Sequence, residues 1–419
     1  MGLKKYKLGE LLDVKRGASL AGEYYATSGD YIRLTCGNFD YQNNSFKLNT
    51  SKDNIYYTGP VRKEFIMSKG DIITPLTEQA IGLLGSTAII PEDNKYIQSQ
   101  DVAKIICNED LLHPMFAYYL ISSETVKKQL SAAAQQTKIR HTSPDRIKDC
   151  VVWVPNLKEQ KHIASILSSL DSKIKLNEQI NQNLEALAKQ LYDYWFVQFD
   201  FPNEEGKPYK SCDGAMVYNE NLKRNIPQGW NDGIFADIAN ITMGQSPDGS
   251  SYNETGEGEI FYQGRTDFGI RFPSVRMYTT SPTRFAKQGD ILMSVRAPVG
   301  AVNIANTDCC IGRGLSAINS KIGSITYIYF VVHYLKVRFD NLNSAGTTFG
   351  SITKDDLFNL PVVIPPSEIV EQFEKVCNPI FDKQMEIGFE IESLTKQRDE
   401  LLPLLMNGQV SLNSDLSNG

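Results

Sequence analysis

The sequence has little of what marks membrane, secreted or metal-binding proteins. Its longest apolar stretches, 327–335 and 151–154, fall far short of the roughly 18 residues that a membrane-spanning helix needs. The opening residues MGLKKYKLGE contain no apolar signal region. Seven scattered cysteines form no CxxC pair, which favours a reduced compartment over a disulfide framework. We therefore expect a cytoplasmic protein.

Catalytic and cofactor motifs are also missing. There is no GxxxxGK[ST] phosphate loop and no HExxH motif. The segment 312–317 fits GxGxx(G/A), but the segment that aligns with it in the first half, 98–103, lacks glycine. A dinucleotide site also needs a βαβ unit and an acidic residue about 20 positions on, so we interpret 312–317 as a strand and a turn. Ser86 and Ser351 lack a GxSxG setting. We expect no catalytic residue, no metal site and no cofactor in this chain. The four histidines stand apart, without cysteine or carboxylate partners at ligand spacing: His113, His141, His162 and His333.

The composition describes a folded chain with a local excess of acid. The 419 residues are 41% hydrophobic and 22% charged, which suits two or three globular domains. The net charge of −6 argues, as a total, against a nucleic-acid partner. However, residues 367–419 hold 4 basic and 10 acidic residues, whereas residues 1–157 hold 19 and 17, and residues 231–366 hold 11 and 12. The acidic excess therefore lies mainly in residues 367–419, and the net charge argues only weakly against a nucleic-acid partner.

The chain contains an internal repeat. DRIKDCVVWVP at 145–155 aligns without gaps with DDLFNLPVVIP at 355–365, an offset of 210. Two upstream blocks align at offsets of 219 and about 227, which indicates loops of different length. Each half combines short β runs with a helix around 114–130 or 325–338, so the fold class is α+β. The upstream blocks pair 69–85 with 288–304 and 8–19 with 234–246.

A long helical region follows each half. Residues 158–196 contain no proline or glycine, and their four-three spacing predicts a coiled-coil seam interrupted by Asn177 and Asn181. In the second region the dipeptide Asn378-Pro379 predicts a helix start near Pro379, with an end near Met406. The predicted apolar seam residues are Ile163, Leu167, Leu170, Ile174, Leu184, Leu191 and Trp195 in the first helix, and Ile387, Ile391, Leu394, Leu401 and Leu405 in the second.

These patterns predict a domain order. A helix of about 38 residues spans roughly 57 Å and lacks a partner of that length within one domain, so we expect the two helices to pair antiparallel, with pseudo-two-fold symmetry. Two helices that span solvent without mutual contact are the alternative. The predicted segments are a first domain at 1–157, a central helix at 158–200, a linker at 201–230, a second domain at 231–366, a C-terminal helix at 367–410 and a disordered tail at 411–419.

Polar loop residues give the remaining signal. Arginine presents a bidentate fork to guanine and glutamine one to adenine, while lysine and threonine more often fix phosphates. Their concentration in aligned loops of both halves indicates a binding face on each domain. The candidates are Arg16, Arg33, Gln79, Gln136, Lys138 and Arg140 in the first half, and Gln245, Arg265, Arg296, Arg313, Thr347 and Thr348 in the second. Gln135 and Arg271 are polar loop residues of the same kind and, with these candidates, form a wider candidate set.

Several segments together resemble a known family. Two related domains alternate with two long helices, and the chain ends in RDELLPLLMNGQV (398–410). This organisation resembles the DNA-specificity subunit of Type I restriction-modification systems. The second helix departs from the first by opening with PPSEIVEQF (365–373) rather than the compact PNLKEQ of 155–160. Further marks are VPNLKEQKHIASIL (154–167), LAKQLYDYWFVQFDFP (187–202) and GKPYKSCDGAMVYNENLKRNIPQGW (206–230).

The resemblance implies a non-catalytic reader of DNA. Residues 1–157 and 231–366 would be target-recognition domains, each binding one half of a split double-stranded DNA site, held apart by an antiparallel helical spacer. It implies two methyltransferase subunits that bind S-adenosylmethionine and flip an adenine, and two restriction subunits that use ATP and magnesium. Two other hypotheses remain: a repeat-domain scaffold that binds proteins, and an enzyme with an unrecognised active site.

Overall fold

The computed structural model describes residues 2–51, 53–78, 82–133, 140–344 and 351–410. The chain divides into two compact units, of which unit 1 comprises Met1–Lys173 with Leu394–Gly419 and unit 2 comprises Ile174–Ser393. Two long helices, α4 (Leu157–Tyr192) and α8 (Ser367–Met406), contribute residues to both units. Within the described residues, no helix is long and apolar enough to cross a membrane. The predicted tail at 411–419 lies outside the described residues.

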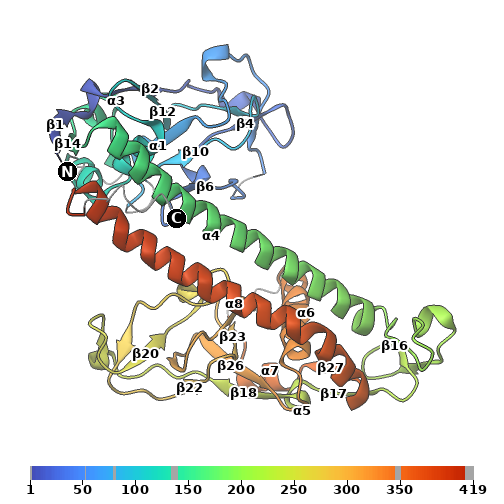
Figure 1. The fold of residues 1–419 in the computed structure, drawn as a ribbon. Coiled ribbons are helices and arrows are strands. Elements are labelled where there is room, and N and C mark those ends of the chain that lie inside the picture. Colours follow the sequence, from blue (N-terminus) through green and yellow to red (C-terminus); the bar gives the residue numbers. More distant parts are fainter. Residues whose placement is uncertain (1, 52, 79–81, 134–139, 345–350, 411–419) are drawn as a thin grey trace, which may run out of the picture. The chain divides into compact units, whose positions relative to one another are not determined.

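Unit 1 is built around a four-stranded antiparallel sheet of order β10-β8-β12-β2. Figure 1 labels three of these strands, β2, β12 and β10. A second sheet has the order β11-β4-β7-β3, and β1 pairs antiparallel with β14. The strands are β1 (Lys4–Lys7), β2 (Leu12–Arg16), β3 (Tyr25–Ala26), β4 (Tyr31–Arg33), β5 (Phe39–Asp40), β6 (Ser45–Phe46), β7 (Tyr56–Tyr57), β8 (Ile72–Pro75), β9 (Thr77–Glu78), β10 (Ala88–Ile89), β11 (Tyr96–Ile97), β12 (Val102–Cys107), β13 (Arg140–His141) and β14 (Val151–Val154). The helices are α1 (Pro114–Ile121), α2 (Glu124–Ala133) and α3 (Pro144–Lys148).

Unit 2 repeats this plan. Its four-stranded sheet has the order β18-β26-β23-β24, and β17 pairs antiparallel with β27. The strands are β15 (Met216–Asn219), β16 (Arg224–Pro227), β17 (Asn231–Ile234), β18 (Ala239–Met243), β19 (Tyr252–Asn253), β20 (Glu259–Tyr262), β21 (Tyr278–Thr279), β22 (Phe285–Ala286), β23 (Ile291–Ser294), β24 (Val302–Ile304), β25 (Cys309–Ile311), β26 (Leu315–Ser320) and β27 (Pro361–Ile364). The helices are α5 (Phe235–Ile238), α6 (Ile325–Ser344) and α7 (Lys354–Phe358).

One inner strand of each four-stranded sheet, β8 or β23, contributes side chains to two separate hydrophobic clusters. Side chains of a strand alternate between its faces, so Ile72 and Ile73 of β8 enter different hydrophobic clusters. Ile291 and Leu292 of β23 do the same in unit 2. Both pairs are at most 4% exposed. These pairs lie at the offset of 219 that the sequence predicts, and the two α+β domains of the predicted fold class are confirmed.

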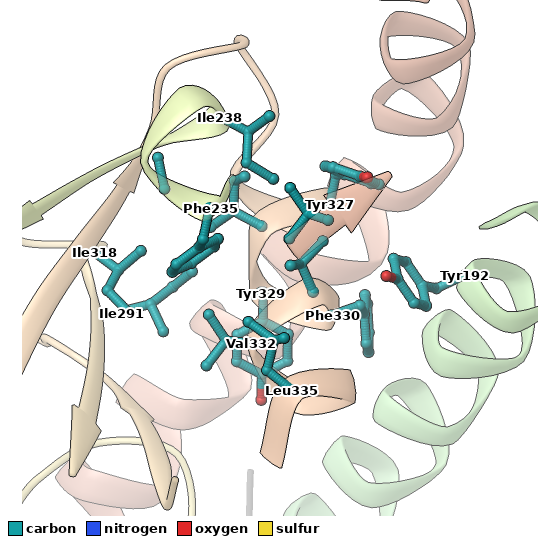
Figure 2. Close-up of a cluster of buried hydrophobic side chains, with 14 of the residues drawn as sticks. Tyr192, Phe235, Ile238, Ile291, Ile318, Tyr327, Tyr329, Phe330, Val332 and Leu335 are labelled. Atoms are coloured by element: carbon teal, nitrogen blue, oxygen red, sulfur yellow. The ribbon is translucent and has the colours of Figure 1, made fainter. Parts of the chain in front are cut away.

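The largest core of unit 2 is rich in aromatic side chains. Figure 2 shows Tyr327 and Phe330 of α6 lying toward Tyr192 of α4, with Phe235 and Ile318 on the side of the sheet. The Tyr192 ring lies 5.6 Å from that of Phe330. Burial of these apolar faces stabilises the docking of α4 on the domain.

Within unit 2, α4 and α8 pack antiparallel. Asn177 Nδ2 donates to Glu390 Oε2 (2.9 Å), and Gln384 Nε2 donates to the Asn181 carbonyl (3.3 Å). The residue numbers on α8 fall as those on α4 rise, so the helices run in opposite directions. Asn177 and Asn181 are buried, at 5% and 4% exposure, as expected of polar seam positions. The alternative of two helices without mutual contact is excluded for this unit.

Within unit 1, one carboxylate ties both helices to the domain. Tyr119 Oη of α1 donates to Asp171 Oδ2 of α4 (2.6 Å), and Arg398 Nη1 of α8 donates to Asp171 Oδ1 (3.2 Å). Leu167 of α4 and Leu405 of α8 belong to one buried cluster. Among the other predicted seam residues, Ile163, Ile174, Trp195 and Ile387 are buried, and Leu170, Leu184, Leu191, Ile391, Leu394 and Leu401 are half-buried.

Two helix predictions need correction. Helix α8 begins at Ser367 and runs through Pro379, so the predicted start near Pro379 is wrong. A proline leaves the carbonyl four residues earlier without its helical partner, but Lys375 and Pro379 are both exposed, so water can hydrate that carbonyl. The single helix predicted around 114–130 is two helices, because the chain turns at Ser122, the C-cap of α1.

Candidate nucleic-acid interface

A tight turn between β25 and β26 is the centre of the candidate surface in unit 2. This turn, Gly312–Gly314, is pressed against two neighbouring segments. A Cβ added at Gly314 would lie 2.5 Å from the Gln263 carbonyl oxygen, and one added at Gly244 would lie 2.9 Å from the Ile311 oxygen and closer still to that of Gly312. Only glycine allows so close an approach of backbone to backbone. The turn is therefore fixed by main-chain packing.

Four predicted residues lie around this turn. Arg313 is within it, and its backbone N–H donates to Ser246 Oγ (3.3 Å). The Gln245 N–H donates to the Ile311 carbonyl (3.1 Å). Arg296 follows Val295, whose N–H donates to the Gly314 carbonyl (2.9 Å). Arg265 follows Gly264, whose Cα lies 3.3 Å from a Cβ built on Gly314. Gln245, Arg265, Arg296 and Arg313 are all exposed.

Unit 1 has the same turn at Ser99–Asp101. A Cβ added at Gly17 would lie 2.6 Å from the Gln98 carbonyl oxygen. Gly17 thus approaches this turn as closely as Gly244 approaches the turn of unit 2. Arg16 Nε donates to the Gln100 carbonyl (2.9 Å), and Thr77 Oγ1 donates to Asp101 Oδ1 (3.2 Å). Next to Thr77, Glu78 of β9 pairs with Arg140 of β13. The structure thus places Arg16 and the backbone of Arg140 around this turn.

Five backbone hydrogen bonds occur at both turns and define their register. Both sets close the turn and tie it to the preceding strand and the neighbouring loops. In unit 1 they run from Gly17 to Val102, Ala18 to Gln98, Leu76 to Asp101, Val102 to Ser99 and Thr142 to Leu76; in unit 2 they run from Gly244 to Leu315, Gln245 to Ile311, Val295 to Gly314, Leu315 to Gly312 and Ile352 to Val295.

This register corrects the sequence alignment by one residue. Aligning 98–103 with 312–317 places Ser99 opposite Arg313, but the hydrogen bonds place Gln100 there. Gln100 is exposed and is the residue that sequence reasoning missed. The strand that follows each turn, β12 or β26, carries the signal, since Val102 and Leu315 begin them.

Arg33 is placed differently from the other candidates. Its guanidinium lies over the Tyr25 ring (3.8 Å to the centroid), and Nη2 donates to the Asn54 carbonyl (3.3 Å). The side chain is half-buried, in β4. Arg33 therefore lies on an inner strand, opposite Ile97 of β11, with its side chain packed on Tyr25. The candidates Gln79, Gln136, Lys138, Thr347 and Thr348, and Gln135 of the wider set, lie outside the described residues.

A cavity of about 280 Å³ opens beside the turn of unit 1. Ala18 and Ile97, which flank the Gln98 segment, contribute to its wall, together with Arg62 and Phe65. Its wall is otherwise apolar or hydroxylic, so the cavity offers one cation and no carboxylate.

Arg271, from the wider candidate set, is not a surface reader. Only 7% of the residue is exposed. Its Nη1 donates to Glu185 Oε2 of α4 (3.1 Å), and its guanidinium lies 4.7 Å from the Phe381 ring centroid. Tyr329 Oη and Gln384 Nε2 also donate to Glu185, at 2.9 and 3.0 Å. Burial lowers the pKa of the neighbouring His333 below its ordinary value, although Glu185 opposes this shift. Arg271 thus joins the domain to the helices inside unit 2.

Two buried cysteines have raised pKa values. Burial raises the pKa of Cys36, whose thiol lies next to Thr77, to about 11, and raises the pKa of Cys309 to about 12. These thiols are protonated near neutral pH and are poor nucleophiles. Across the described ranges, no group of three or more histidine, cysteine or acidic side chains is arranged to hold a metal ion.

Comparison with known proteins identifies the family. The model of the family "Type I restriction modification DNA specificity domain" matches residues 2–186 and 227–395. The putative type I restriction enzyme MjaX specificity subunit of Methanocaldococcus jannaschii is 32% identical over 319 residues, which cover 72% of this chain and 69% of the relative. The type I restriction enzyme HindI specificity subunit of Haemophilus influenzae is 24% identical over 483 residues, which cover 97% and 99%.

A solved structure supports the same fold. The crystal structure of the type-I restriction-modification system S subunit from M. genitalium has a TM-score of 0.57 at 17% identity, and the match covers 99% of this chain and 97% of that one. The predicted resemblance is confirmed, and a protein-binding scaffold without DNA binding is not favoured. The chain belongs to the family of type I restriction-modification DNA specificity subunits, the non-catalytic components of these systems.

Proposed function

We propose that this chain reads a bipartite site in double-stranded DNA, with one half-site bound by residues 1–157 and the other by residues 231–366. The observation that carries the proposal is the turn built by the same five backbone hydrogen bonds in both units. Each turn bears exposed amide or guanidinium side chains on a main chain held by close packing. Such groups match the donor and acceptor edges of bases in the major groove.

The charge distribution favours base reading over bulk attraction. The two proposed reading domains are nearly neutral, with 19 basic against 17 acidic residues in the first and 11 against 12 in the second. Phosphate contacts dominate non-specific affinity, and a neutral domain supplies few of them. We expect partner subunits to supply the basic surface, and the isolated chain to bind random duplex weakly at physiological salt.

The long helices set the distance between half-sites in this proposal. Helix α4 has 36 residues, which corresponds to roughly 54 Å at the rise of an α-helix. It contributes residues to both units. Inserting one heptad would lengthen it by roughly 10 Å and should add base pairs to the spacer.

The partners follow from the family. Two methyltransferase subunits would bind S-adenosylmethionine and modify an adenine in each half-site, and two restriction subunits would use ATP and magnesium to translocate and cleave DNA. The assembly would act in the cytoplasm. No residue of this chain is assigned a chemical step.

Methylation mapping of a host that expresses this chain with its methyltransferase tests the proposal. We expect methylated adenines in a motif of two specified blocks separated by a fixed unspecified spacer. Replacing residues 1–150 with another reader domain should change one block and leave the other unchanged. A single continuous motif, or a change in both blocks, would contradict two-headed reading. An unchanged spacer after the heptad insertion would contradict the role of the helix.

A further inference from the structure

The two turns carry different side chains at one equivalent position. We infer that Gln100 and Arg313 are specificity-determining residues, such that Gln100 selects an adenine in the half-site of the first domain and Arg313 selects a guanine in the half-site of the second. This inference rests on the proposed function and names the residues that read the bases.

The equivalence comes from the hydrogen bonds of the turn. Ser99 and Gly312 each accept from the N–H three residues later, of Val102 (3.1 Å) and Leu315 (3.0 Å). The residue after each acceptor is therefore Gln100 in one unit and Arg313 in the other. Each occupies the same place between the closing hydrogen bond and the start of a central strand.

Both side chains are free to bind a ligand. Gln100 and Arg313 are exposed, and among the described residues neither side chain has a hydrogen-bond partner. Their neighbours differ in this respect. Gln98, two residues before Gln100, is 2% exposed, and its Nε2 donates to the carbonyls of Lys15 (2.7 Å) and Val102 (2.9 Å). The amide of Gln98 holds the turn, whereas the amide of Gln100 is available.

Hydrogen bonds and close packing hold the backbone of both residues in place. In unit 1, Arg16 Nε donates to the carbonyl of Gln100 (2.9 Å) and so holds the residue by its backbone. In unit 2, the N–H of Arg313 donates to Ser246 Oγ (3.3 Å), and the flanking glycines lie against neighbouring backbone. Because the backbone is already fixed, binding need order only the two side chains and not the loops that carry them.

The chemistry of the two side chains decides the bases. Glutamine presents one donor and one acceptor, which match N6 and N7 of adenine, whereas arginine presents two donors, which match O6 and N7 of guanine. Each such pair gives roughly a ten- to hundredfold preference for its base. Different side chains at one position give two half-sites that differ at the corresponding base.

Reciprocal substitutions in the complete methyltransferase complex test the inference. We expect Gln100→Arg to change one adenine of the first half-site to guanine, and Arg313→Gln to change one guanine of the second half-site to adenine. Each variant should leave the other half-site as it was, so each serves as a control for the other. Gln42→Arg, an exposed glutamine beside the β5–β6 hairpin, makes the same charge change and should leave the motif unchanged.

Methylome sequencing gives the motif for each variant. Wild-type motifs after both substitutions, at undiminished methylation, would overturn the inference while leaving the proposed function intact. If Gln100→Arg abolishes methylation, Gln100→Ala provides the test. Loss of base preference at one position of the methylated motif would support the inference, and an unchanged motif would refute it. A wild-type chain that directs no bipartite methylation would instead overturn the proposed function.

Discussion

Removing the Glu185 carboxylate should destabilise unit 2, because it leaves a buried guanidinium without its counter-charge. Glu185 accepts hydrogen bonds from Arg271 (3.1 Å), Tyr329 (2.9 Å) and Gln384 (3.0 Å). In Glu185→Ala the guanidinium of Arg271, whose side chain is 7% exposed, would stay buried without its counter-charge. Its Nε and Nη2 already lack partners among the described residues. Its other hydrogen bond runs from Nη1 to the neutral Tyr329 hydroxyl (3.5 Å), which supplies no counter-charge.

The expected loss follows from burial. Removing one partner of a fully buried ion pair costs about 3–5 kcal/mol. The side chain of Glu185 is 30% exposed, so water can replace part of the carboxylate, and we expect about 2–3 kcal/mol. Replacing Glu185 and Arg271 together with methionine removes both charges, and this double variant should be more stable than Glu185→Ala by roughly 1–2 kcal/mol.

Tryptophan fluorescence can report unit 2 alone. Trp195 and Trp230 are 7% exposed and lie in its aromatic core, while Trp153 is 50% exposed and lies in unit 1. In a Trp153→Phe background, urea unfolding followed by fluorescence therefore measures unit 2. Exposed Leu187→Ala, on the same helix, is the control and should change the free energy of unfolding by less than about 0.5 kcal/mol. Equal midpoints for Glu185→Ala and this control would refute the argument from the buried pair.

Three further outcomes are expected. Burial lowers the pKa of His333 below 6.5, so as pH falls the unfolded chain binds a proton at this histidine before the folded chain does. Unit 2 should therefore lose stability from about pH 6.5 down to the pKa of the folded state. The variant His333→Phe should reduce this pH dependence in the same urea assay. Gly244→Ala would force a Cβ against the facing carbonyls of the turn and should lower the free energy of unfolding by roughly 1–3 kcal/mol. Gly249 has open space around it, so Gly249→Ala is the control and should be near neutral. Equal losses of stability in the two variants would contradict the packing argument. Gln160, 1% exposed, accepts from the His113 N–H at 2.8 Å, so Gln160→Leu should cost about 1–3 kcal/mol and speed amide hydrogen exchange at His113; unchanged exchange there would show that the bond is dispensable.

The repeat and the helices could be predicted because they depend on local patterns. Apolar spacing from Ile163 to Leu191 identified α4, and the polar seam positions Asn177 and Asn181 are buried as expected. The offset of 210 at the closing strands reappears in the pairing of β14 with β1 and of β27 with β17. Such features need only the identity of neighbouring residues.

Features that depend on distant contacts could not be predicted. Arg271 has the composition of a surface reader, but its burial depends on Glu185 and Phe381, which lie far away in the sequence. Pro379 looked like a helix start, yet its exposure on α8 allows the helix to continue. Gln100 was missed because a one-residue shift in a turn is visible only in backbone hydrogen bonds.

The way the turns are supported has a consequence for how such readers diversify. Glycine packing and backbone hydrogen bonds hold positions 100 and 313, so the side chains at these two positions are not needed for the fold of the turn. Mutation there can alter the recognised sequence without a matching loss of stability, and selection can explore new specificities one base at a time. In contrast, substitution of Gly17, Gly244 or Gly314 would place a Cβ against neighbouring backbone and destabilise the turn. Variation among natural relatives should therefore concentrate on the exposed turn residue and spare its glycine supports.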